Sequence, residues 1–325
     1  MQTAEPLVSF IVLGWNNKDL LPECFNSIQT QTYKNFQIIY VDNGSSDSSL
    51  EFVRSNYPSV IAVDATKNTG FAIGNNIGIA KAFEDADCRY VALVNTDATL
   101  AKDWLETLTA FAAQHEHCGS LQTPTFDYYD HAVLDSYGIT VDHYGRAMQL
   151  GYRSTGPLPA TQKVFGTNAA AALFTRDFLK SQPFGDDYFD SDLWMYLEDV
   201  DLAARATIMG WDNWYVDQSA AYHMGSASSS KNPGFSVYMI YRNNFPMIIK
   251  NFPVTIILKV LPGLLATDLK TIFNLFRGRN KRALIALLKG RIHGLKFIPL
   301  MVKKRKMLKH AIGNKALWEL MAKSR

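Results

Sequence analysis

The sequence has few cysteines, and none of them lies in a metal-binding pattern. Cys24, Cys88 and Cys118 are odd in number and widely spaced, with no CxxC pair and no histidine placed to complete a zinc site. This pattern excludes a disulfide-rich scaffold and a structural zinc domain. It favours a protein that folds in a reducing compartment.

Long apolar runs are also missing. A membrane-spanning helix needs about 18–20 consecutive apolar residues. The best candidate, 252–269, is interrupted by Pro253, Lys259, Pro262 and Asp268. We therefore expect no transmembrane span, which leaves association with a membrane surface open.

Acidic residues almost disappear near the C-terminus. Residues 269–325 contain 16 Lys/Arg and one acid, a net charge of +15, whereas residues 1–268 contain 17 Lys/Arg and 29 Asp/Glu, a net charge of −12. In the C-terminal stretch the basic residues are interleaved with apolar ones, as in helices that lie in membrane interfaces. We predict a domain over 1–250 and a helical, basic, amphipathic membrane-associating region over 251–325 that contacts an anionic membrane surface.

The composition of this basic region is also compatible with two other roles. A nucleic-acid patch is less favoured, because the apolar content is too high for an arm that tracks phosphates, and we expect no nucleic-acid partner. A helical bundle that packs on the first domain with a basic surface stays open.

The N-terminal third alternates between buried strands and helical patterns. The predicted helices lie at about 20–30, 48–56 and from the glycine-rich segment to about 86. The predicted strands lie at 7–13, 36–41, 60–63 and 90–94. This alternation predicts an α/β fold with a mostly parallel central sheet, whose ligands bind at the carboxyl ends of the strands.

Polar residues follow these strands where chemistry is expected. Asp42 and Asp97 each come directly after a strand, and an Asn- and Gly-rich segment, 67–78, lies between them. A single acid in such a place is often only a helix cap, but two in one sheet favour a binding site. The segment 67–78 lacks the GxGxxG spacing of a dinucleotide site, so a nicotinamide or flavin enzyme is not favoured.

Several ordered motifs between residues 7 and 245 together resemble one family. They are 9–17 (SFIVLGWNN), 41–47 (VDNGSSD), 68–76 (NTGFAIGNN), 94–97 (VNTD), 165–171 (FGTNAAA), 189–190 (FD), 196–202 (YLEDVDL), Arg205, 210–211 (GW) and 222–223 (YH). The combination looks like an inverting family 2 glycosyltransferase with the GT-A (Rossmann-like) fold. It most resembles bacterial rhamnosyltransferases of cell-surface polysaccharide synthesis, such as O-antigen and cell-wall glycans.

The resemblance implies a donor site. It gives Asp42 a contact with the base or ribose of a nucleotide sugar, and Asp97 a bond to Mg²⁺ or Mn²⁺ on the donor diphosphate. Asn95 stands where the family has the first acid of its Asp-x-Asp element, and His223 corresponds to a further metal ligand. The donor-binding residues implied are Trp15, Asn17, Asp42, Asn68, Gly70, Asn75, Asn95 and Asp97.

The same resemblance implies a general base at the start of a predicted helix, 199–209. Asp199 is the first choice, Glu198 the alternative and Asp201 a distant third. Acids at a helix N-terminus also occur simply because the helix dipole favours them.

The implied function is metal-dependent transfer of L-rhamnose from dTDP-rhamnose to a lipid-linked or polysaccharide acceptor, by a peripheral enzyme on the cytoplasmic face of the cell membrane. A UDP-hexose or UDP-galactofuranose donor is the alternative, and a non-catalytic nucleotide- or glycan-binding protein is the alternative from another class. A homo-oligomer stays open.

Two further segments were interpreted from composition. The Tyr-, Asp- and His-rich stretch 126–156 is either part of a sugar pocket or a β-rich insertion with surface tyrosines. The Gly/Ser-rich stretch 225–231 is either a loop that folds over the donor or an ordinary connector.

Overall fold

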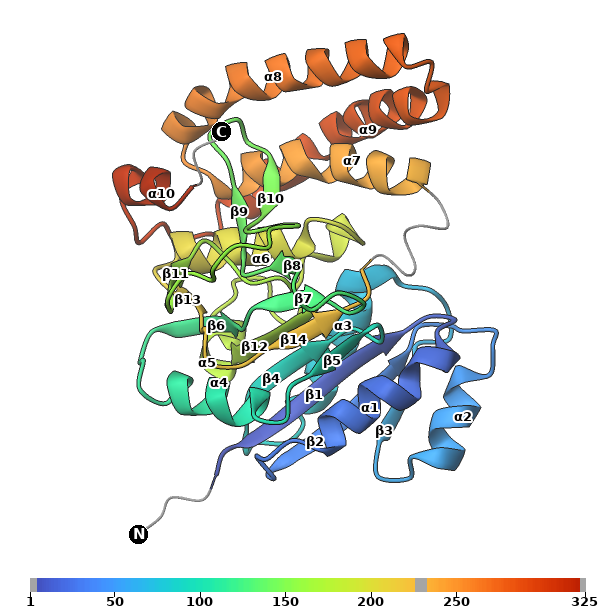
Figure 1. Ribbon diagram of the computed structural model, residues 1–325. Helices are drawn as coiled ribbons and strands as arrows, with labels where there is room; N and C mark the ends of the chain where they lie inside the picture. The colour runs from blue at the N-terminus through green and yellow to red at the C-terminus, as the bar shows by residue number, and fades with distance from the viewer. Residues whose placement is uncertain (1–4, 226–232, 322–325) are drawn as a thin grey trace.

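The computed structural model describes residues 5–225 and 233–321, and its centre is an eight-stranded sheet (Figure 1). The strand order is β11-β13-β6-β12-β4-β1-β2-β3. The strands are β1 (Leu7–Gly14), β2 (Phe36–Asp42), β3 (Ile61–Asp64), β4 (Cys88–Val94), β6 (Cys118–Gln122), β11 (Gln162–Val164), β12 (Ala171–Thr175) and β13 (Asp212–Tyr215). In the half of the sheet formed by β4, β1, β2 and β3, neighbouring strands are parallel. In the other half, β12 runs antiparallel to both of its neighbours, and β11 runs antiparallel to β13. The predicted mostly parallel sheet is confirmed, with a mixed half that includes β12 and β11.

Helices cover both faces of this sheet, because apolar side chains point alternately to its two faces along the buried strands. In β1, Phe10 and Val12 face one hydrophobic cluster and Ile11 faces the other. The first cluster includes residues of α1 (Leu21–Gln29), α2 (Ser49–Asn56) and α4 (Trp104–Ala112), and the second includes residues of α3 (Gly70–Ala82), α5 (Arg176–Lys180) and α6 (Glu198–Ile208). Two short 3₁₀ turns, η1 (Lys18–Leu20) and η2 (Ser191–Leu193), lead into α1 and toward α6.

Segment 126–156 forms short strands, so it is a β-rich insertion. Four strands, β5 (Ala98–Leu100), β14 (Ala221–His223), β7 (Thr125–Asp127) and β8 (Leu134–Ser136), form a second sheet in that order. A hairpin of β9 (Ile139–Val141) and β10 (Ala147–Gln149) follows. Tyr129 and Tyr152 of this insertion are exposed.

The C-terminal region is helical, as predicted. Within the predicted region 251–325 lie α8 (Val254–Arg277), α9 (Lys281–Arg305) and α10 (Asn314–Leu320). The preceding helix α7 (Pro233–Asn251), almost all of which falls in the predicted first domain, is stacked with them above the sheet in Figure 1. Buried residues of α7, α8 and α10 share a third hydrophobic cluster with residues of α6. Glycines let α7 and α9 approach closely, since a Cβ at Gly290 would lie 2.5 Å from the Tyr238 carbonyl oxygen. Within the described residues, no helix has the length and apolarity needed to cross a bilayer.

A buried charge network joins the helical region to α6. Lys250 of α7 forms ion pairs with both Asp190 and Asp201, and Lys304 of α9 forms one with Asp190 at 2.5 Å. Arg205 pairs with Asp201 at 3.0 Å. Because all of these acids and cations are largely removed from water, replacing one of them by a neutral residue would leave a buried charge uncompensated. The network makes Asp201 a structural residue of this interface.

Candidate functional site

The loops that follow β1, β2 and β4 meet at the carboxyl edge of the sheet. The Asn43 backbone N–H donates to the Gly14 carbonyl oxygen at 2.8 Å, which joins the first two loops. The Asn17 side-chain amide lies 2.6 Å from the Thr96 hydroxyl, which joins the first loop to the segment after β4. The structure thus brings Asn17 together with the segment that holds Asn95 and Asp97.

Asp42 is held in place at the end of β2 and is only 3% exposed. The Tyr40 hydroxyl donates to its Oδ1 at 3.2 Å, and the Ser45 backbone N–H donates to its Oδ2 at 3.0 Å. Burial and the nearby Asp42 charge raise the pKa of Tyr40, so this phenol stays protonated. The carboxylate is therefore fixed in orientation before any ligand binds.

Asn68 and Gly70 shape the entrance to α3. Asn68 Oδ1 accepts a hydrogen bond from the Gly70 N–H at 2.9 Å. Gly70 has φ +80°, and a Cβ there would lie 2.5 Å from the Trp194 carbonyl oxygen. Only glycine fits this position without strain, because an L side chain is disfavoured at positive φ.

Asn75 and Trp15 differ in accessibility. Asn75 is buried, and its side-chain amide donates to the Phe71 carbonyl oxygen inside α3 at 2.9 Å. Trp15, directly after β1, is 41% exposed. The structure leaves the Trp15 ring accessible to a ligand and engages the Asn75 amide within its own helix.

The second sheet brings Asp97, His223 and Asp135 together. In the antiparallel pair of β14 and β5, His223 stands opposite Ala98, next to Asp97. His223 Nε2 lies 3.3 Å from Asp97 Oδ1, and its Nδ1 lies 3.1 Å from Asp135 Oδ2. The predicted pair of metal ligands therefore meets, although 126 positions separate its members in the sequence.

The two carboxylates govern the charge of His223. Burial by itself lowers the pKa of the imidazole, but the hydrogen bonds to Asp135 and Asp97 outweigh it and raise the pKa to about 10. Sequence reasoning missed Asp135, because it lies within the short strand β8 and not at a strand end. Only the pairing of β14 with β7 and of β7 with β8 brings it to His223.

Asp97 and His223 could supply two of the several ligands that one divalent cation needs. Two neighbouring ligands at right angles on an ion with bonds of about 2.1 Å stand about 3 Å apart, and Asp97 Oδ1 lies 3.3 Å from His223 Nε2. In the part of the chain that the structure describes, no group of three or more His, Cys, Asp or Glu could hold a metal ion. Such a two-ligand site suits a cation that substrate phosphates help to coordinate.

The segment before α6 has a strained backbone. Trp194, Tyr196 and Leu197 have φ values of 62°, 66° and 69°, in the left-handed region that non-glycine residues rarely occupy. The Asn243 side chain stabilises this conformation by donating to three carbonyl oxygens within 193–196, at 2.7 to 2.9 Å. Such strain concentrates at functional sites, and Asn243 is a second residue that sequence reasoning missed.

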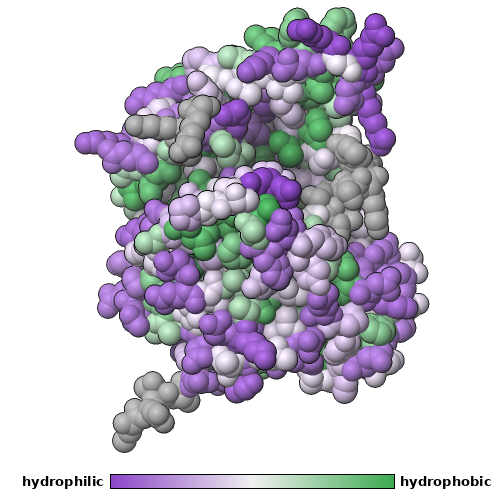
Figure 2. Space-filling model, viewed as in Figure 1, coloured by the Kyte–Doolittle hydropathy of each residue, from purple (hydrophilic) through white to green (hydrophobic). Residues whose placement is uncertain are grey.

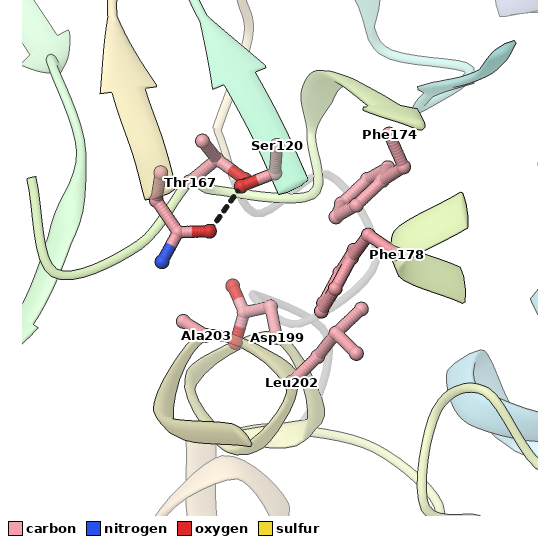
Figure 3. A pocket seen from close by; sticks show the side chains of 8 residues that line it. Ser120, Thr167, Phe174, Phe178, Asp199, Leu202 and Ala203 are labelled. Atoms are coloured by element: carbon pink, nitrogen blue, oxygen red, sulfur yellow. Dashed lines mark hydrogen bonds between the residues drawn. The ribbon is translucent and has the colours of Figure 1, made fainter. Parts of the chain in front are cut away.

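Asp199 is the second residue of α6 and is partly buried. Figure 3 shows its carboxyl group directed from α6 into a narrow pocket lined by Ser120, Thr167, Phe174, Phe178, Leu202, Ala203 and Asn213. Burial raises its pKa to about 6, although backbone hydrogen bonds from Val200 and Ala169 act in the opposite direction. Ala170, the residue after Ala169, accepts a hydrogen bond from the Asn95 N–H at 2.9 Å. Because Ala169 contacts Asp199 and Ala170 contacts Asn95, Asp199 lies close to the segment after β4.

Glu198 has a different environment. It is buried, and its Oε2 has no hydrogen-bond partner in the described structure. Burial and the adjacent Asp199 charge raise its pKa well above the ordinary glutamate value. The pKa of Glu198 is thus raised by burial and by its acidic neighbour, whereas Asp199, with a pKa of about 6, is ionised at neutral pH. The stretch 225–231, predicted as a loop over the donor, lies almost entirely in residues 226–232, outside the described residues.

Comparisons with solved structures agree with this architecture. The chain superimposes on Staphylococcus aureus TarS 1–349 with a TM-score of 0.59 at 18% identity, covering 92% of this chain and 87% of that one. It superimposes on the mannosyltransferase PcManGT from Pyrobaculum calidifontis, solved with GDP-Man and Mn²⁺, with a TM-score of 0.57 at 17% identity, covering 94% and 85%. These likenesses confirm the predicted GT-A fold.

Sequence relatives are bacterial glycosyltransferases. The putative teichuronic acid biosynthesis glycosyltransferase TuaG of Bacillus subtilis is 27% identical over 148 residues, which cover 44% of this chain and 54% of TuaG. Three further curated glycosyltransferases are matched over only 14% to 34% of their own length. The model of the family "Glycosyl transferase family 2" matches residues 9–181, more than half of the chain. The chain therefore belongs to glycosyl transferase family 2.

Proposed function

We propose that this protein transfers a sugar from a nucleotide donor to a growing cell-surface glycan, with inversion at the anomeric carbon. The observation that carries the proposal is the Asp97–His223 pair at 3.3 Å, placed beside the convergent loops at the carboxyl edge of the sheet. Asp199, with a pKa of about 6, lies near the same edge. Family membership supports the reaction class.

The donor would lie across the loops that follow the parallel strands. The fixed Asp42 carboxylate would accept hydrogen bonds from the base or ribose, and Trp15 offers an exposed aromatic face for stacking. Asn17, Asn68, Gly70, Asn75 and Asn95 complete the proposed donor-binding set. For Asn75 and Gly70 the described contacts support a role in shaping the α3 entrance.

Asp97 and His223 would hold Mg²⁺ or Mn²⁺ together with the donor diphosphate, and the cation would displace the proton that the raised pKa otherwise keeps on Nε2 of His223. A bound divalent cation neutralises charge that develops on a leaving diphosphate. In this arrangement the Nδ1–H of His223 donates to Asp135, which fixes the ring so that Nε2 faces Asp97.

Asp199 would act as the general base. Its carboxylate removes the proton of the acceptor hydroxyl while that oxygen attacks the anomeric carbon and the bond to the diphosphate breaks. A pKa of about 6 leaves Asp199 ionised at neutral pH yet more basic than an ordinary aspartate. Asp199 lines the pocket of Figure 3, whereas Glu198 is buried outside it, which supports Asp199 over Glu198.

For the donor we propose L-rhamnose delivered as dTDP-rhamnose, on the resemblance of the motifs between residues 7 and 245. A UDP-hexose or UDP-galactofuranose is the second candidate, since TarS, with the same fold, has been solved in complex with UDP. We propose a lipid-linked glycan at the inner face of the cell membrane as the acceptor. The name of TuaG, a teichuronic acid biosynthesis enzyme, supports a role in cell-surface glycans.

A panel of nucleotide sugars tests this function. Each donor is incubated with the protein and Mn²⁺, Mg²⁺ or EDTA, and release of nucleotide diphosphate and stabilisation against heat are measured. The proposal predicts one preferred donor whose binding and turnover require the cation. Heat stabilisation by a nucleotide sugar without turnover on any glycan acceptor would favour the non-catalytic binding protein.

A further inference from the structure

The outer faces of α8 and α9 carry apolar side chains that the fold leaves uncovered. On α8 the exposed residues are Val254, Leu258, Leu265, Leu269, Phe273 and Phe276, spaced by three, four or seven positions. On α9 they include Ile285, Leu288, Ile292 and Leu295, spaced by three or four positions. Residues at these intervals share one helix face, so each helix presents a continuous apolar stripe to solvent.

These stripes lie opposite the packed faces of the helices. The buried residues of α8 are Ile256, Val260 and Leu264, all in its first half. From Leu265 to Arg277 no residue of α8 is buried, and Leu269 and Phe276 are 68% and 73% exposed. Figure 1 places α8 along the outer side of the helical layer.

Exposed cations flank both stripes. On α8 they are Lys259, Lys270 and Arg277, and on α9 they are Lys289, Lys296 and Lys303. Figure 2 shows hydrophobic and hydrophilic residues side by side over this layer. No acid occurs from residue 269 to residue 318. The surface therefore combines uncovered apolar side chains with positively charged ones.

We propose that this α8/α9 surface, defined by the ten apolar residues and six cations named above, docks on an anionic lipid bilayer. Apolar side chains enter the interface while adjacent Lys and Arg contact lipid phosphates, and neither helix has to span the membrane. A second copy of this chain fits the surface poorly, because pairing would bring together two regions of net charge +15. Nucleic acid offers the apolar stripes nothing to pack on.

Ion pairs fix the orientation of this surface relative to the sugar-transfer site. Arg291 of α9 pairs with Asp268 of α8 at 2.7 Å, which joins the two helices. Lys304, at the other end of α9, pairs with Asp190 and Asp192 at 2.5 and 2.6 Å, next to the segment that leads into α6. Docking would hold the site at a set distance from the bilayer. That consequence rests on the proposed function, whereas the docking itself does not.

Co-sedimentation of the full chain with vesicles tests the proposal. The protein is mixed with vesicles of phosphatidylcholine alone or with phosphatidylglycerol added, and binding is expected only with the anionic lipid. The double variant Leu269→Gln/Phe273→Gln should weaken binding at least about tenfold. The double variant Lys270→Gln/Arg277→Gln should weaken it about fivefold for each charge removed.

Matched controls are available elsewhere on the surface. Leu158→Gln removes an exposed apolar side chain and Lys102→Gln an exposed cation, both outside the C-terminal helices, and both variants should bind vesicles like the wild type. The proposal is overturned if the wild-type protein does not bind anionic vesicles. It is also overturned if the α8 variants bind these vesicles as tightly as the wild type. A dimer in light scattering that Leu269→Gln/Phe273→Gln dissociates, or stronger binding to a DNA duplex than to vesicles, assigns the surface to another partner.

Measuring nucleotide binding distinguishes failure of the docking proposal from failure of the proposed sugar transfer. Heat stabilisation by a nucleotide sugar and Mn²⁺ should be the same in the wild type and in both α8 variants, because the substitutions lie on the outer face of α8. Vesicle binding without any nucleotide binding would leave the docking surface standing and remove the proposed sugar transfer.

Discussion

Replacement of Asp199 by asparagine should make the protein more stable and less active. Burial raises the pKa of this carboxyl from 3.8 to about 6, so the fold carries an ionised group that it disfavours. At a cost of about 1.36 kcal/mol per pKa unit, the penalty reaches at most about 3 kcal/mol above pH 6. Asparagine keeps one oxygen that can accept the hydrogen bond of the Val200 N–H, and it cannot ionise.

The sign of the pH dependence follows from the raised pKa. The native state holds a proton on Asp199 up to about pH 6, whereas the unfolded chain releases it near pH 3.8, so this group lowers stability as pH rises between these values. The stability gained by Asp199→Asn should therefore be about 3 kcal/mol at pH 8 and roughly half of that at pH 5. Urea unfolding at the two pH values measures the difference.

Activity should change in the opposite direction. Loss of a general base typically costs about 10²–10⁴-fold in rate, and donor binding should be retained. Wild-type kcat/KM should fall as pH decreases through about 6, because the carboxylate becomes protonated. Glu51→Gln, an exposed acid in the first turn of α2, is the matched control and should change neither quantity appreciably. An Asp199→Asn variant with lower stability at pH 8, or with wild-type turnover, refutes the reasoning.

Three more predictions address the donor site. Asp97→Ala should weaken cation-dependent donor binding by about 100-fold or more while leaving the fold intact, as calorimetry with Mn²⁺ and the preferred nucleotide would show. Asp135→Asn should weaken Mn²⁺ affinity about 10–100-fold through loss of the His223 orientation, and an unchanged affinity would deny Asp135 that role. Gly70→Ala should lower the free energy of unfolding by more than the about 1–2 kcal/mol expected for Gly185→Ala, since both glycines have positive φ but only Gly70 has Trp194 against the new Cβ. Equal losses in urea unfolding would show that the Trp194 contact is unimportant.

The order of strands and helices could be predicted because local patterns determine it. Buried apolar runs gave β1, β2, β3 and β4 to within two residues, and the polar residues after them gave the edge where Asp42 and Asp97 lie. The antiparallel insertion of β12 between β4 and β6 could not be predicted, since strand order depends on packing between distant segments. The predicted boundary at 250/251 stays a prediction, and it falls inside α7, which packs against α9.

The site was only partly visible in the sequence for the same reason. Asp97 and His223 were found through motifs, whereas Asp135 and Asn243 act through contacts that no spacing indicates. Composition indicated the basic helical region, but the sequence did not show which side of α8 and α9 packs on the domain. The exposed stripes became apparent only once Ile256, Val260 and Leu264 were seen to be buried.

The central claim is that the Asp97–His223 pair and Asp199 support transfer of a sugar from a nucleotide donor. The most direct measurement is release of nucleotide diphosphate from the preferred nucleotide sugar in the presence of acceptor glycan, with Mn²⁺ or EDTA, for wild type, Asp97→Ala and Asp199→Asn. Our account predicts cation-dependent release by the wild type, loss of donor binding in Asp97→Ala, and retained binding with slow release in Asp199→Asn. Release that is indifferent to EDTA and to both substitutions would contradict it.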